Sequence, residues 1–285
     1  MMALKTSDSF AGDGFRRVVL ALDPSADYVA AVREAAMLAA QLGAELSAVF
    51  VEDRAHLGAA AHPFVRCFSA GAVRWQEFGV ADMERAYRTM AEKARRVTEE
   101  AAGSRKLRWS FEIARGEVEA SAIEAADEAD LVVLGAGMDR LRAGSVRAPL
   151  DWRRSERTHR SVLILRPQAS RAPHIVVLYD GTDGAGRALL AARHLGDPAN
   201  LRIILTAGDE PAAHQLENPA RDLLGSRADE AEFIALPGLG LEGLRRFAAR
   251  TGAGLLILAA GSELLADETA ARELDQCPCR VLVVR

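Results

Sequence analysis

The order of apolar segments starts again half-way along the chain, and this restart constrains the fold more than any other feature. The run Val18–Leu22 ends in Asp23, and the run Ile175–Tyr179 ends in Asp180. The later apolar runs at 131–134 and 162–165 correspond in the same way to those at 255–258 and 281–284. A restart of this kind indicates an internal duplication. Because 285 residues exceed the usual size of one hydrophobic core, we expect two domains in tandem.

The apolar runs are short and continuous, which is typical of strands buried on both faces. Ala- and Leu-rich segments separate them, such as residues 30–42, which Gly43 is placed to end as a helix. Further predicted elements are a strand at 106–113 and a helix at about 118–128. Strands that alternate with helices predict crossover connections and parallel pairing. We therefore predict an α/β fold with two doubly wound parallel five-stranded sheets in tandem.

Domain boundaries follow from the same pattern. Residues 1–14 form a polar tail, residues 15–168 the first domain and residues 174–285 a shorter second domain. The linker is predicted at Gln168–Pro173, where prolines interrupt the pattern. The first domain carries an insertion at about 52–80, followed by a predicted long helix at 81–102. Because this insertion contains Phe64, Phe68 and Trp75, we interpret it as a flap or as an arm packed against the other half.

Composition excludes several classes of protein. A formal net charge of -4 does not suit a nucleic-acid-binding domain, which usually carries a basic face. No apolar stretch is long enough for a membrane-spanning helix, and the polar start lacks the apolar core of a signal peptide. Three cysteines are too few for a disulfide framework. We expect a cytoplasmic protein that binds neither nucleic acid nor membrane.

Two segments carry a resemblance to a known family. Gly116-Glu117-Val118 followed by the strand Asp130–Gly135 resembles the central signature of the universal stress proteins, and Cys277–Arg285 resembles their closing strand. The resemblance implies the strand order 3-2-1-4-5 in each domain. It also implies antiparallel pairing of the two fifth strands, at 162–165 and 281–284, which makes an intramolecular pseudo-two-fold dimer. A further homodimer of whole chains stays open.

A ligand site is expected where the strand order reverses, beyond the carboxyl ends of strands 1 and 4. Nucleotide-binding members of the family have a loop of the form G-x2-G-x9-G-(S/T) after strand 4, where glycines let backbone N–H groups approach phosphates. This chain departs from that loop at Met138, Ala148 and Pro149, and in the second half at Ala259 and Ser262. The candidate nucleotide-binding residues of the first domain are Asp23, Gly135, Gly137, Gly144 and Ser145.

Other reactive side chains form weaker patterns. Seven arginines between Arg140 and Arg160 either hold an anion or line a solvated helix face. Cys277 and Cys279 are too few for structural zinc, and a disulfide across one residue is strained, so Cys279 is interpreted as a core residue. His56 and His62 share the insertion with Cys67, a weak indication of a metal or redox site. We predict no metal site and no catalytic residues.

These patterns favour a stress-response protein that acts by binding or scaffolding, with degenerate nucleotide sites. Its partner is an unidentified protein or small ligand, and no cofactor is required. One alternative is an ATP- or AMP-binding sensor that uses the first domain only. The other is a weak ATPase or another nucleotide-dependent enzyme, but no general base is evident near the site, so we expect no enzymatic activity.

Overall fold

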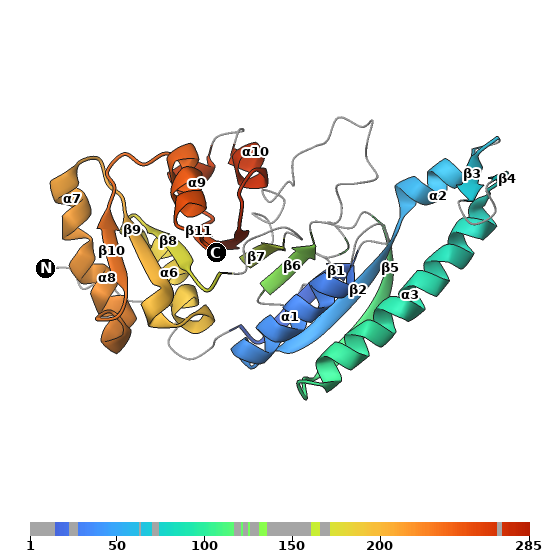
Figure 1. Ribbon diagram of the computed structural model, residues 1–285, viewed down its shortest axis with the longest axis horizontal. Coiled ribbons are helices and arrows are strands. Elements are labelled where there is room, and N and C mark those ends of the chain that lie inside the picture. The colour runs from blue at the N-terminus through green and yellow to red at the C-terminus, as the bar shows by residue number, and fades with distance from the viewer. Residues whose placement is uncertain are drawn as a thin grey trace, which may run out of the picture.

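The computed structural model shows one large sheet at the centre of the molecule. The described residues are 15–22, 28–62, 64–69, 74–116, 121, 125, 131–135, 161–165, 172–266 and 270–285. Within them, ten strands form a continuous sheet in the order β10-β9-β8-β11-β12-β7-β6-β1-β2-β5. Figure 1 shows the C-terminal half at one end of this sheet and the N-terminal half at the other. The α/β class is confirmed, and the two predicted sheets are joined into one.

The N-terminal half contributes five parallel strands. They are β1 (Arg17–Leu22), β2 (Glu45–Asp53), β5 (Trp109–Gly116), β6 (Leu131–Gly135) and β7 (Ser161–Leu165). Taken in chain order, they lie side by side as 3-2-1-4-5. The third strand begins at Trp109 rather than at Lys106, and it continues to Gly116 rather than ending at Ile113. This extension occurs because β2 is long enough to pair with β5 as far as Asp53 opposite Gly116.

The C-terminal half repeats this arrangement with shorter strands. They are β8 (Ile175–Tyr179), β9 (Leu201–Leu205), β10 (Glu232–Ala235), β11 (Leu255–Ala259) and β12 (Arg280–Val284). All four pairings among them are parallel, and their order is again 3-2-1-4-5. The duplication predicted from the apolar runs is therefore visible as a repeated strand order.

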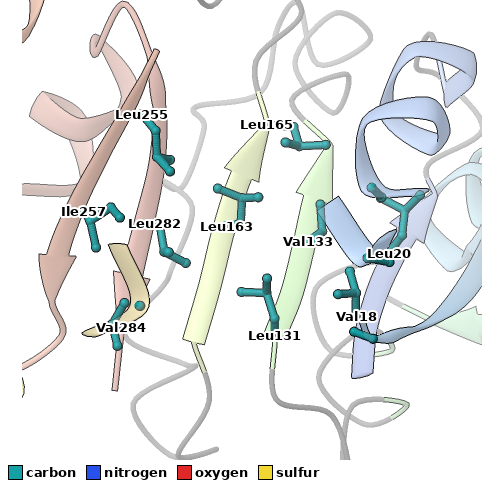
Figure 2. Close-up of a cluster of buried hydrophobic side chains, with 14 of the residues drawn as sticks. Val18, Leu20, Leu131, Val133, Leu163, Leu165, Leu255, Ile257, Leu282 and Val284 are labelled. Atoms are coloured by element: carbon teal, nitrogen blue, oxygen red, sulfur yellow. The ribbon is translucent and has the colours of Figure 1, made fainter. Parts of the chain in front are cut away.

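The two halves meet where β7 pairs with β12. The pairing is antiparallel, with Leu163 opposite Leu282 and Ile164 opposite Val281, as the family resemblance implied. Figure 2 shows the side chains of Leu163 and Leu282 beside each other at this join, between those of β6 and β11. Because each of the two strands covers the otherwise open edge of the other, neither half leaves an apolar edge strand exposed here.

Among the described residues, helices cover both faces of the C-terminal half, and they cover one face of the N-terminal half, while the helical residue Ala125 packs on its other face. One face packs against α1 (Tyr28–Leu42), α3 (Val80–Gly103), α6 (Asp183–Leu195) and α8 (Glu217–Leu224), and its core runs without a break across the join. On the other face, α9 (Leu241–Arg250) and α10 (Ala270–Asp275) cover the C-terminal half. The C-terminal half also contains the short α7 (Glu210–Gln215) and the 3-10 turns η2 (Pro198–Asn200), η3 (Gly225–Arg227) and η4 (Glu263–Leu265).

Local sequence explains where these helices begin and end. Gly43 follows α1 with a φ of 64°, a left-handed conformation that glycine adopts without steric cost, so the predicted helix end is confirmed. The side chain of Thr182 accepts a hydrogen bond from the backbone N–H of Ala185 and caps the start of α6. The predicted helix at 118–128 lies outside the described residues apart from Ser121 and Ala125, which are helical.

The insertion at 52–80 is more regular than predicted. It contains α2 (Arg54–Ala60) and an antiparallel hairpin of β3 (Arg66–Ser69) and β4 (Arg74–Glu77). Figure 1 places α2 and the hairpin beside α3, at the end of the molecule remote from the C-terminal half. Phe64 is 95% exposed and Trp75 is 59% exposed. The interpretation as an arm packed against the other half is therefore wrong.

Candidate functional site

The first candidate site lies at the carboxyl ends of β1 and β6. These strands are neighbours, with Ala21 opposite Leu134, so Gly135 ends β6 beside the end of β1. This is the reversal of strand order at which ligands of α/β sheets bind. The other candidate residues, Asp23, Gly137, Gly144 and Ser145, lie outside the described residues, as do the seven arginines. The structure thus gives the positions of the strand ends at this site. The roles of the residues in the loops that follow these strands stay predictions.

The equivalent position in the second half is described in full. Asp180 follows β8, and its Oδ1 accepts hydrogen bonds from the backbone N–H of Thr182 at 3.0 Å and from its hydroxyl at 2.6 Å. The same threonine oxygen accepts the N–H of Ala185 at 3.2 Å. One oxygen of the Asp180 carboxylate is therefore engaged in the turn that starts α6, which is common chemistry for an aspartate after a strand.

The loop after β11 also makes its own hydrogen bonds. The N–H of Ala260 donates to the carbonyl of Val284 at 2.7 Å, and the N–H of Ser262 donates to that of Ala259 at 3.1 Å. In a phosphate-binding loop these N–H groups point at the ligand. The start of α6 also lies close to this loop, because a Cβ on Gly184 would stand 3.2 Å from the Cβ of Ala259. Two amides of the loop after β11, those of Ala260 and Ser262, are therefore engaged within the chain.

Tyr179 is the other titratable group at this end of β8. Burial raises the pKa of its phenol above the ordinary value, and the negative charge of Asp180 raises it further. A phenol with a raised pKa stays protonated at neutral pH, so Tyr179 can donate a hydrogen bond but is a poor general base.

A second group of polar side chains lies at the carboxyl ends of β2 and β5. Arg115 pairs with Glu52 at 2.8 Å and with Glu84 of α3 at 3.3 Å. The hydrogen bond from Arg115 to Glu52, and then the attraction between their charges, raises the pKa of Arg115. Beside them, Nδ1 of His56 lies 3.0 Å from the hydroxyl of Tyr87, which donates to the carbonyl of Asp53 at 3.4 Å.

This polar group was missed by sequence reasoning, although one signal was present. The register of β2 and β5 brings Glu52 opposite Arg115, and an acidic residue and an arginine at the ends of neighbouring strands predict such a pair. The side chains come from β2, α2, α3 and β5, so their contacts fix the insertion to the sheet. Among the described residues, no group of three or more His, Cys, Asp or Glu side chains is arranged to hold a metal ion.

The surface formed by the described residues is hollowed between α1 and the join of the halves, and also between α3 and β5. The hollow beside α1 is lined by Met37, Leu163 and Leu282. The Glu34–Arg280 pair contributes its charges. The hollow between α3 and β5 is lined by Arg88, Glu92, Arg95, Ala91, Phe111 and Ile113. Neither hollow joins a nucleophile to a base, so neither has the geometry of an active site.

This chain resembles known proteins in its fold. No family model and no curated protein matches the sequence. A universal stress protein from Archaeoglobus fulgidus matches at a TM-score of 0.61 and 15% identity, over 94% of this chain and 96% of its own. The fold is that of the universal stress proteins. The match covers nearly all of both chains, so the likeness of fold includes both halves of this chain.

Two proteins from Pseudomonas aeruginosa are also similar. A protein of unknown function matches at a TM-score of 0.56 and 18% identity, over 95% of this chain and 92% of its own. A candidate universal stress protein matches at a TM-score of 0.54 and 17% identity, over 95% of this chain and 93% of its own. At these identities the likeness to universal stress proteins is one of fold.

Within the described part of the chain, no helix is both long and apolar enough to cross a membrane.

Proposed function

We propose that this chain is a stress-response protein that acts by binding or scaffolding rather than by catalysis. The observation that carries the proposal is the loop after β11, where Ala260 and Ser262 use their N–H groups within the chain. The second half, in which these two amides are engaged, still keeps the strand order and the β7–β12 join. The whole-chain likeness to a universal stress protein supports the stress-response role.

The proposal includes degenerate nucleotide sites and an unidentified protein or small ligand as partner. The join of the halves supports an intramolecular pseudo-dimer, since β7 and β12 satisfy each other within one chain. An ATP- or AMP-binding sensor that uses only the first domain is the second candidate. It is favoured by Gly135, which ends β6 at the reversal of strand order beside β1.

Native mass spectrometry of the purified and desalted protein, followed by the same measurement under denaturing conditions, tests the proposal. We expect a protein without a bound nucleotide and no saturable signal in a titration with fluorescent ATP or AMP, with or without Mg²⁺. A co-purified nucleotide would support the sensor instead. Steady phosphate release from ATP that grows with protein concentration would contradict the absence of catalysis.

Two matched variants locate any binding that is found. Asp23→Ala and Asp180→Ala change the same position of the two repeats. If the first domain holds a nucleotide, Asp23→Ala weakens binding and Asp180→Ala does not. Equal weakening by both variants would contradict a site confined to the first domain, and circular dichroism of each variant checks that the fold is kept.

A further inference from the structure

Two cysteines lie side by side in the turn between α10 and β12. The sulfur atoms of Cys277 and Cys279 are 3.8 Å apart. Both residues are buried, at 4% and 0% exposed, whereas Pro278 between them is exposed at the surface. The N–H of Cys277 donates to the carbonyl of Leu274 at 3.0 Å, which places this turn directly at the end of α10. The two thiols therefore meet just beneath the surface.

The surroundings of the two thiols favour a disulfide, which is neutral, over a bound metal ion. Both cysteines belong to the apolar core under α9 and α10, together with Leu256, Leu274 and Val281. In the described part of the chain, no third metal-ligating side chain completes a site with them. Structural zinc takes four ligands, and an uncompensated charge is costly in an apolar core. A disulfide is neutral and needs only the two sulfurs.

We propose that Cys277 and Cys279 form a reversible dithiol–disulfide switch that is oxidised by a hydroperoxide. One thiol attacks an oxygen of hydrogen peroxide and passes its proton to the departing oxygen, so the O–O bond breaks, a sulfenic acid forms and one water leaves. The second thiol then attacks that sulfur, the S–O bond breaks, and a second water leaves with the S–S bond formed. The two sulfurs are oxidised and hydrogen peroxide is reduced to two waters.

The short spacing makes this pair suited to switching rather than to permanent cross-linking. A disulfide needs its sulfurs about 2.05 Å apart, so the turn around Pro278 must rearrange when the bond forms. A bond that closes across a single residue is strained, and strained disulfides are readily reduced again. The strain that argues against a permanent structural disulfide between Cys277 and Cys279 therefore favours a disulfide that is reversible.

The next residue connects this turn to the join of the two halves. Arg280 follows Cys279 directly, and it pairs with Glu34 of α1 at 2.8 Å and donates to the carbonyl of Gly254 at 2.9 Å. It also begins β12, the strand that pairs with β7. Rearrangement of the turn therefore moves a residue that holds the halves together. We expect oxidation to weaken the join.

Mass spectrometry of the oxidised protein tests whether the bond forms. The experiment uses a Cys67→Ser background, because Cys67 is exposed and reacts with oxidants on its own. The folded protein is treated with hydrogen peroxide, denatured and alkylated. We expect the peptide with both cysteines to carry no alkyl group and to weigh two hydrogens less than its dithiol form. Dithiothreitol is expected to restore two alkylation sites. Cys277→Ser in the same background is the matched control and should form no such product.

Several results would overturn the switch. One is a peptide that keeps both alkylation sites after peroxide treatment of the folded protein, and another is a disulfide that forms only in urea. The coupling to the join is tested by hydrogen exchange in β7 and β12. We expect faster exchange in the oxidised protein and recovery with dithiothreitol, and no change on peroxide treatment of Cys277→Ser. Equal exchange in the two states of the Cys67→Ser protein would overturn the coupling.

Discussion

Arg280 of β12 pairs with Glu34 of α1 at 2.8 Å, although 246 residues separate them in the chain. The two side chains are 21% and 16% exposed, so water screens the pair only in part. Because α1 belongs to the first half and β12 to the second, this ion pair links the halves on the face covered by α1 and α6. The link adds a charged contact to the apolar join of β7 and β12.

Glu34→Ala is expected to lower the free energy of unfolding by about 1–3 kcal/mol, because it leaves the partly buried Arg280 without its carboxylate. Urea denaturation of the variant and the parent measures the difference. Glu242→Ala is the matched control, since Glu242 pairs with Arg246 on the exposed side of α9, where such pairs contribute about 0.3–0.5 kcal/mol. Equal losses in the two variants would contradict a special role for the Glu34 pair.

Leu282→Ala is expected to destabilise both halves together. Leu282 is fully buried in the core that crosses the join, opposite Leu163. Its truncation leaves a cavity there and should lower the free energy of unfolding by about 2–5 kcal/mol. Hydrogen exchange followed by mass spectrometry distinguishes the halves. Loss of protection confined to β8–β12 would mean that the halves unfold independently.

The apolar runs predicted the strands well for a physical reason. Strands such as β1 and β11 are buried on both faces, so nearly every residue must be apolar, and the pattern is visible without knowledge of the neighbours. The antiparallel join at Leu163 and Leu282 came from the family resemblance and not from the pattern, because apolar edges do not specify their partner.

The polar contacts could not be predicted in the same way. Glu34 and Arg280, and likewise His56 and Tyr87, are brought together by packing between elements far apart in the sequence. Helical periodicity identified α3 within one residue at either end, but it gave no information about α2 or the hairpin, which are short and partly exposed. Of the candidate nucleotide site, only Gly135 lies within the described residues.

Gly254→Ala is expected to be strongly destabilising because the backbone passes very close to this residue. A Cβ at Gly254 would stand only 1.9 Å from the carbonyl oxygen of Ala172, so the chain entering the second half would have to shift. Overpacking of this kind costs about 1–3 kcal/mol. Gly208→Ala is the matched control, because its Cβ would meet no atom within 4 Å. Thermal denaturation should show a large loss for the first variant and little for the second.

The hydrogen bonds of Asp82 at the start of α3 are expected to make the stability of the folded protein depend on pH. Its Oδ2 accepts the N–H of Gly79 at 3.0 Å, and its other oxygen pairs with Arg85. The hydrogen bond from Gly79, and then that from Arg85, lowers the pKa of this carboxyl below the ordinary 3.8. Because the folded pKa is the lower one, the stabilisation is fully present well above 3.8 and is lost as the pH falls through the folded value.

Asp82→Ala should therefore lower the thermal midpoint at neutral pH, and the difference from the parent should shrink only as the pH falls below 3.8. Thermal scans at several values from about pH 7 to about pH 3 measure this difference. Glu99→Ala, on the exposed side of the same helix, controls for the loss of a negative charge. A difference that is independent of pH would mean that Asp82 acts through its helical position and not through its ionised carboxylate.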